Sequence, residues 1–325
     1  MSGGTERAIE GALLGTAVGD ALGLPYEGLS PGRAARLLGE PDRYRFLLRR
    51  GMVSDDTEHS CMVAQALAAS GGEVARFRRH LAWGLRLWLL GLPAGIGLAT
   101  LRATVRLWRG VSPERSGVFS AGNGPAMRSA VIGAAVDDLD AMTRLVKAST
   151  TLTHTDPRAF QGAVAVALAA RMARDGNEIP ADDYLRSLDS LIRPVSTELL
   201  ETLRGAAESV RRGESTRCFA AGLGLERGVS GYVNHTVPVA LHAWLAHPAD
   251  FRAAVTEIIR CGGDTDTSAA ITGGIVGSAV GQEGIPDEWL TSLAEWPRTV
   301  AWMRRLARTA DRSLRSQGAV SVPRL

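Results

Sequence analysis

The chain has 325 residues, of which 45% are hydrophobic and 22% charged, as in an ordinary soluble globular protein. Its formal net charge is only +3, and its basic residues, all arginines except Lys147, are scattered, so we expect no stable nucleic-acid partner. The three cysteines lie far apart, which argues against a disulfide framework or a zinc site and favours a reducing compartment.

Membrane and export signals are missing from the sequence pattern. The first apolar stretch is interrupted by Asp20, and its charged start lacks the apolar core of a signal peptide. The uncharged run at 268–282 is too short and too rich in glycine for a membrane span. We therefore expect a cytoplasmic protein without a membrane partner. Because no coiled-coil seam is visible, we also expect a monomer.

Apolar residues recur mainly at helical spacing, and strand-like alternation is scarce. The pattern predicts helices over residues 6–22, 56–69, 158–174, 196–212, 236–246, 250–260 and 266–280. Gly11, Gly15 and Gly19 recur every four residues, which predicts close contact between buried helices despite the cost of glycine in a helix. No linker divides the chain, so we predict an all-α fold with one compact domain over 1–325. Its arginine-rich tail after about residue 305 is expected to be peripheral.

Two acidic residues stand near the end of the first predicted helix. Asp20 lies between glycines in an apolar helix, so we expect it to be buried, hydrogen-bonded and structural. Glu27 follows the end of this helix near Gly23 and is placed on a loop. Taken alone, Glu27 is an ordinary surface glutamate.

A first cluster of polar residues, Ser54-Asp55-Asp56-Thr57-Glu58, opens the helix predicted over 56–69. Helix capping alone is a sufficient explanation for it. Ser and Asp are common N-caps, and Asp55 and Glu58 have the spacing of a cap and its N3 carboxylate.

A second cluster, Asp264-Thr265-Asp266-Thr267, follows a Gly-Gly turn and leads directly into the apolar helix over 266–280. Two acids at the mouth of a core are harder to explain as caps, because unpaired buried carboxylates are costly. If the two clusters face each other, their acids repel strongly unless divalent cations compensate them. Carboxylate and hydroxyl oxygens without Cys or His favour Mg²⁺ or Mn²⁺.

Three loops are candidates for holding the rest of a ligand. The small-residue segment 120–128 is expected to enter a helix with Pro125 in its first turn, where free N–H groups could bind a diphosphate; a simple turn is an equally good explanation. His154 could contact a sugar hydroxyl or be structural. The segment 231–238 could border a pocket or merely cap the helix that is expected to start at Thr236.

Together these segments resemble the ADP-ribosylglycohydrolases, the group of the dinitrogenase-reductase-activating glycohydrolase and the ADP-ribosyl-acceptor hydrolases. The matching motifs run in order along the chain, at 11–27, 54–57, 120–128, 153–157 and 262–267. The pair of acidic clusters is the most specific part of the match. The resemblance implies an orthogonal helical bundle with two divalent cations, Mg²⁺ or Mn²⁺, in a central cleft.

The resemblance also implies roles for individual residues. The implied metal ligands are Ser54, Asp55, Asp56, Asp264, Asp266 and Thr267. The implied catalytic residues are Glu27, Asp55 and Asp264, and the implied substrate-binding residues are Ser120, Gly122, Asn123, Gly124 and His154. Many members have Thr in place of Ser54, which preserves the hydroxyl. Gly95 occupies the position where members that act on ADP-ribosyl-arginine can carry an acid, which leaves arginine specificity open.

The expected activity is that of an N- or O-glycosyl hydrolase, which cleaves the C1″ bond between ADP-ribose and its acceptor. The substrate would be an ADP-ribosylated protein, nucleic acid or small molecule. Two alternatives stay open. One is a binding protein for ADP-ribose without turnover. The other is a metal-dependent phosphohydrolase that cuts the diphosphate of a similar nucleotide and would release AMP.

Overall fold

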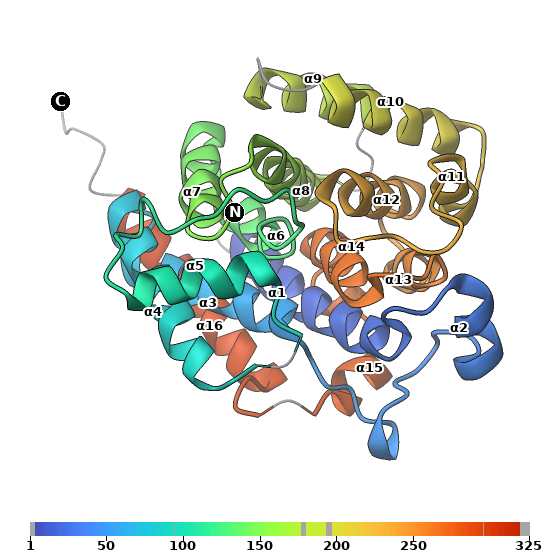
Figure 1. Cartoon of the computed structure of the whole chain (residues 1–325), viewed down its shortest axis with the longest axis horizontal. Coiled ribbons are helices and arrows are strands. Elements are labelled where there is room, and N and C mark those ends of the chain that lie inside the picture. The colour runs from blue at the N-terminus through green and yellow to red at the C-terminus, as the bar shows by residue number, and fades with distance from the viewer. Residues whose placement is uncertain (1–3, 94, 177–179, 193–196, 295, 319–325) are drawn as a thin grey trace.

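The computed structural model describes residues 4–93, 95–176, 180–192, 197–294 and 296–318, and these residues form helices joined by loops with isolated β-bridges (Figure 1). Its α-helices in chain order are α1 (Gly4–Gly23), α2 (Pro31–Leu38), α3 (Asp55–Ser70), α4 (Val74–Leu90), α5 (Leu98–Trp108), α6 (Ala130–Ala135), α7 (Leu139–Thr151), α8 (Pro157–Asp175), α9 (Ala181–Ile192), α10 (Thr197–Arg211), α11 (Thr216–Gly222), α12 (Val233–Ala246), α13 (Phe251–Ile259), α14 (Thr265–Val280), α15 (Asp287–Ser292) and α16 (Val300–Gly318). Short 3₁₀ turns occupy Leu24–Tyr26, Leu47–Arg49 and Gln282–Gly284. The prediction of an all-α fold is confirmed, and every helix predicted from periodicity is present.

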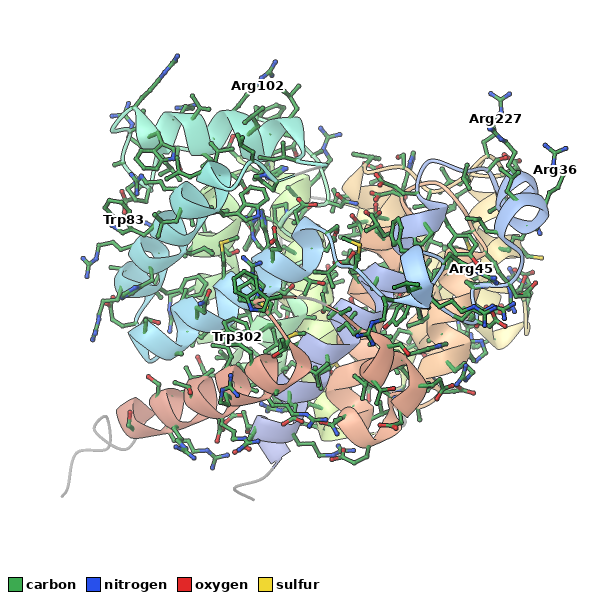
Figure 2. All side chains as sticks on the ribbon, turned by 90° about the horizontal axis from the view of Figure 1, so that it is seen from below. Arg36, Arg45, Trp83, Arg102, Arg227 and Trp302 are labelled. Atoms are coloured by element: carbon green, nitrogen blue, oxygen red, sulfur yellow. The ribbon has the colours of Figure 1, made fainter. Side chains whose placement is uncertain are left out.

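Several helices lie outside the predicted ranges, and α4 shows the reason. Its buried face carries Phe77, Leu81 and Leu85 at helical spacing. Its opposite face exposes Trp83 and Leu87 as well, and Trp83 points outward from the surface in Figure 2. Apolar residues on both faces obscure the period from which an amphipathic helix is recognised. None of the helices in the described ranges has the length and apolar character needed to cross a bilayer.

Helices α1 and α14 cross the centre of the bundle as an antiparallel pair in backbone contact (Figure 1). A Cβ atom on Gly11 would lie 2.0 Å from the carbonyl oxygen of Gly277, and one on Gly15 would lie 2.1 Å from that of Gly273. These distances are far inside van der Waals contact, so only glycine fits. The predicted role of the four-residue glycine spacing is confirmed: it lets two largely buried helices approach closely.

The contact between α1 and α14 also places the last residue of α1 next to the first residue of α14. Thr265, the first residue of α14, donates from Oγ1 to the carbonyl oxygen of Gly23, the last residue of α1, over 2.9 Å. A Cβ on Gly23 would lie 2.3 Å from the carbonyl oxygen of Thr265. The start of α14 is therefore fixed beside the end of α1.

The described part of the segment after residue 305, which ends at Gly318, is not peripheral, contrary to the expectation; residues 319–325 lie outside the described residues. This part belongs to α16, which packs against α1 and α3. Met303, Ala307 and Ala310 are fully buried in this contact. Their spacing of three and four residues places them on one face of the helix, which the basic residues of the other face conceal in the sequence.

Candidate active site

The starts of α3 and α14, together with several loops that connect helices, surround a cleft of about 590 Å³. Its lining includes the predicted residues Glu27, Asp55, Asp264, Asp266, Thr267, Ser120, Gly122, Asn123, Gly124 and His154. Ser54 and Asp56 are not part of this lining. Asp56 accepts a hydrogen bond from Thr267, which does line the cleft, and Ser54 donates to Asp56. The structure thus brings together, around one cavity, segments that are separated by more than a hundred residues in the sequence.

The start of α3 is held in place by an acid from another helix. Ser54 is the N-cap, and its Oγ accepts from the backbone N–H of Asp56. The carboxylate of Asp20 in α1 accepts from the backbone N–H of Ser54 at 2.9 Å and from the hydroxyl of Thr57 at 2.6 Å. Burial raises the pKa of Asp20, while the hydrogen bonds from Thr57 and Ser54 lower it. The structural role expected for Asp20 is confirmed.

The interpretation of Asp55 and Glu58 as a cap with its N3 carboxylate is wrong. Glu58 accepts from the indole N–H of Trp88 and from the guanidinium of Arg298. The first N–H groups of α3 are already met by Ser54 and Asp20, so no cap from Asp55 is needed. The carboxylate of Asp55 lines the cleft instead.

The start of α14 presents the second cluster. Gly262 and Gly263 have φ values of +70° and +81°, which L-residues with side chains rarely adopt, and they form the turn before the helix. Asp264 occupies the N-cap position but makes no side-chain capping hydrogen bond. Its Oδ2 accepts from the side-chain amide of Asn123 at 2.6 Å. Asp264 is therefore directed toward the cleft and not toward its own helix.

The two clusters are joined at Asp56. Its Oδ2 accepts from the hydroxyl of Ser54 at 3.0 Å and from that of Thr267 at 3.2 Å, so α3 and α14 share this carboxylate. The other oxygen, Oδ1 of Asp56, is buried and has no hydrogen-bond partner among the described residues, and the same is true of Oδ1 of Asp266. Buried acceptors without partners are costly, so these two oxygens are open to a donor or a cation that the described side chains do not supply.

The pKa shifts of the acids in the two clusters also favour a bound positive charge. Burial, followed by the charge of neighbouring acids, raises the pKa of Asp55, Asp56 and Asp266. Burial and then the charge of Asp264 raise the pKa of Glu27. The folded chain therefore opposes full ionisation of these carboxylates unless a positive charge joins them.

The donor set suits hard divalent cations such as Mg²⁺ or Mn²⁺, since it consists of carboxylate and hydroxyl oxygens. As they stand, no three Asp, Glu, His or Cys side chains of the described residues are arranged as a metal site. Binding a cation would require the carboxylates to turn and the hydroxyls of Ser54 and Thr267 to contribute. The chemistry of the residues fits the cations, and their orientation would have to adjust.

The loop with the predicted substrate-binding residues is fixed through Asn123. Its side-chain amide donates to Thr236 at 3.0 Å as well as to Asp264, and its backbone N–H donates to Gly231. The backbone N–H of Gly122 donates to the hydroxyl of Ser120. These bonds anchor the loop between α12 and α14.

The expectation of a helix start at Pro125 is wrong, and the alternative of a simple turn is the one that the structure shows. The chain forms consecutive turns after Asn123, whose carbonyl oxygen accepts from the N–H groups of Ala126 and Met127. Helix α6 begins only at Ala130. The tertiary bonds of Asn123 determine the backbone here and override the local preference of Pro125 for a first helical turn.

Other parts of the lining were not found from the sequence. The residues 97–100 line the cleft, although none carries a recognisable motif. Ser230 and Gly231 also line it, so the segment before α12 does border the pocket; its helix begins at Val233, before the expected start at Thr236. Gly95 lies in the lining with a φ of +74°, where the family resemblance placed a variable acid.

Known proteins match this chain along almost its full length. A family model described as ADP-ribosylglycohydrolase matches residues 1–319. An uncharacterized protein of Archaeoglobus fulgidus is 33% identical over 298 residues, which cover 89% of this chain and 92% of that protein. The ADP-ribosyl-[dinitrogen reductase] glycohydrolase of Rhodospirillum rubrum is 27% identical, with 89% of this chain and 90% of the relative covered. ADP-ribosylhydrolase ARH3 of Gallus gallus is also 27% identical, with 89% of each chain covered.

A solved structure supports the same grouping. The structure described as an ADP-ribosylglycohydrolase-related protein complex superposes with a TM-score of 0.66 at 25% identity and covers 95% of this chain and 99% of its own. Its helical fold matches the one described above. The family model and the relatives together show that the chain belongs to the ADP-ribosylglycohydrolase family.

Proposed function

We propose that the protein is a metal-dependent hydrolase that removes ADP-ribose from a modified acceptor by cleaving the glycosidic bond at C1″. The observation that carries this proposal is a pair of buried oxygens, Oδ1 of Asp56 and Oδ1 of Asp266, which have no hydrogen-bond partner in the described part of the chain and lie beside a cleft of about 590 Å³. Named relatives in Rhodospirillum rubrum and Gallus gallus are ADP-ribosyl hydrolases by their descriptions, which supports the reaction class.

The proposed cofactors are two divalent cations, Mg²⁺ or Mn²⁺. The residues that would hold them are Ser54, Asp55, Asp56, Asp264, Asp266 and Thr267. When bound, the cations would supply charge that orients ribose hydroxyls and polarises a water molecule. The buried position of Asp56 and Asp266 supports this assignment, because cations would offset the repulsion among the acids.

The chain's own side chains divide the remaining work. The carboxylate of Asp55 faces the cleft and can accept a proton from the attacking water. Asp264 is oriented by the amide of Asn123, which keeps its Oδ2 directed at the cleft. Glu27 lies at the lining with a raised pKa, so it can hold the proton that the departing acceptor takes.

The test is a turnover panel with the purified protein in Mg²⁺, in Mn²⁺ or in chelator. The substrates are arginine-, serine- and nucleic-acid-linked ADP-ribose, and the products are identified by mass spectrometry. The expected result is cation-dependent release of intact ADP-ribose, lost in Asp264→Asn. Glu27→Gln is expected to lower turnover with cation binding retained, while Glu226→Gln, which alters an exposed acid outside the cleft lining, is the matched control and should leave turnover unchanged.

Two other outcomes would replace the proposal. Release of AMP would show a phosphohydrolase. Tight binding of free ADP-ribose without turnover of any substrate in the panel would favour a binding protein.

A further inference from the structure

A buried arginine next to the cleft takes no part in the mechanism above. The guanidinium of Arg128 is completely buried, and the hydrogen bonds that it makes go to neutral groups. It donates to Oγ and the carbonyl oxygen of Ser149, both at 3.0 Å, to Nδ1 of His59 at 3.0 Å and to Oγ1 of Thr153 at 2.8 Å. Burial lowers its pKa to about 10, so the group still carries its charge at neutral pH.

The proton positions along this chain of bonds follow from donor capacity. A guanidinium has donors and no acceptor, so Oγ1 of Thr153 must accept from Arg128. Thr153 is itself fully buried, and a buried hydroxyl proton needs an acceptor. Nδ1 of His154, at 2.9 Å, is the acceptor within reach. Thr153 therefore donates to Nδ1 of His154, and the ring proton of His154 lies on Nε2.

The ring of His154 is held against the substrate loop. A Cβ atom on Gly122 would lie 3.1 Å from Nε2, and one on Gly124 would lie 3.2 Å from Cε1, so the glycines allow the loop to pass close to the ring. Reciprocal backbone hydrogen bonds between Val118 and the residues on either side of His154 fix its backbone. Among the described residues, the structure gives Nε2 no protein hydrogen-bond partner, and His154 lines the cleft.

We propose that Arg128 and Thr153 are positioning residues that hold His154 as its neutral Nε2–H tautomer, so that the cleft presents a fixed hydrogen-bond donor to an oxygen of the bound ADP-ribose. The identity of that ligand rests on the proposed function; the tautomer does not.

The neutral state has a physical advantage in this site. Burial and then the charge of Arg128 lower the pKa of His154 to about 3. An imidazolium at this position would repel divalent cations in the same cleft. A neutral ring can still donate one hydrogen bond to a sugar or phosphate oxygen without that repulsion.

The tautomer can be observed directly in the ligand-free protein. Histidine labelled with ¹⁵N gives separate NMR signals for protonated and unprotonated ring nitrogens, and His154→Asn assigns its signals among the six histidines. We expect Nε2 protonated and Nδ1 unprotonated from pH 6 to 8. Protonation of Nδ1 over this range would overturn the proposal.

Matched variants test the role of Thr153. Thr153→Val removes the hydroxyl with little change in shape and is expected to shift the Nδ1 signal and raise the Kd for ADP-ribose in Mg²⁺ roughly three- to tenfold, as for the loss of one neutral hydrogen bond. Thr153→Ser should restore both values. Thr155→Val makes the same change at an exposed neighbouring threonine and should alter neither.

Unchanged Nδ1 signals and an unchanged Kd in Thr153→Val would overturn the positioning role. If Thr153→Val does not fold, the NMR signals of the wild type still decide which tautomer His154 adopts. Thr153→Ser then tests the positioning role, because loss of the hydrogen bond to Nδ1 in a variant that keeps the hydroxyl contradicts the proposal. These readouts need no turnover, so they stand apart from the hydrolase assay: a correct tautomer without ADP-ribose release would defeat only the proposed function.

Discussion

Replacing Asp56 with asparagine is expected to stabilise the cation-free protein at pH 8 and to abolish its turnover. Asp56 is buried among other acids, and its pKa is raised, first by burial and then by Asp266. An amide has a similar shape without the charge. In chelator at pH 8 we expect a melting temperature higher by roughly 1.5–3 °C, which corresponds to about 1–2 kcal/mol in a chain of this size.

The pH dependence gives the sign of this effect. When a carboxyl group has a higher pKa folded than unfolded, the folded state binds more protons, so stability falls as pH rises from the unfolded pKa to the folded one. The raised pKa values of Asp55, Asp56 and Asp266 therefore predict that these three acids lower the stability of cation-free wild type as pH rises from 5 to 8. The lowered pKa values of His59, His154 and His242 act in the opposite direction over this range, so the comparison of Asp56→Asn with wild type at each pH isolates the acid. The gain from Asp56→Asn should shrink toward pH 5.

The effect on activity should be opposite in direction. Loss of even an indirect contact to a catalytic metal lowers affinity or activity by roughly ten- to a hundredfold, so loss of a direct ligand should exceed that range. Asp140→Asn, which alters an exposed acid on α7, is the control and should change neither property. An Asp56→Asn variant with wild-type turnover would contradict the assignment of Asp56 as a ligand.

The second large effect is on stability. Gly15→Ala would place a Cβ atom 2.1 Å from the carbonyl oxygen of Gly273 and force α1 away from α14. Overpacking of a rigid core costs up to about 3 kcal/mol and sometimes more, and here the obstacle is backbone, which cannot rotate away. We expect a loss of at least about 3 kcal/mol in urea unfolding, or no folded protein at all.

Gly205→Ala provides the matched control. Gly205 lies in the middle of α10, and a Cβ atom there meets nothing within 4 Å. The same substitution should stabilise the protein by about 0.5–1 kcal/mol through helix propensity. If Gly15→Ala were as stable as Gly205→Ala, the close packing of α1 on α14 would be incorrect.

The features that could be predicted are those written locally in the sequence. The two acidic clusters stand immediately before apolar helices, and this juxtaposition survives in the structure at the starts of α3 and α14. The glycines of α1 recur every four residues in the sequence, and this spacing alone predicts the close contact of α1 with another helix. Residues such as Asp55, Asp264 and Asn123 were therefore found, because each belongs to a short motif.

The features that were missed depend on partners distant in sequence. Asp20 caps α3 from another helix, which made a local cap by Asp55 seem sufficient. The tertiary bonds of Asn123 delay the helix that Pro125 suggested. Arg128 is one of many arginines in the sequence, and nothing local marks it as fully buried. Burial of a charge depends on hydroxyl and carbonyl groups that only the fold assembles around it.

The claim that the paired carboxylate clusters bind two cations can be tested most directly by titrating the purified protein with Mn²⁺ and measuring free Mn²⁺ by electron paramagnetic resonance. Saturable binding of two ions per chain, strongly weakened in both Asp56→Asn and Asp266→Asn and unchanged in Asp140→Asn, is the predicted result. The opposite result, no saturable binding in wild type or equal binding in all four proteins, would show that the facing acids of α3 and α14 are not a cation site.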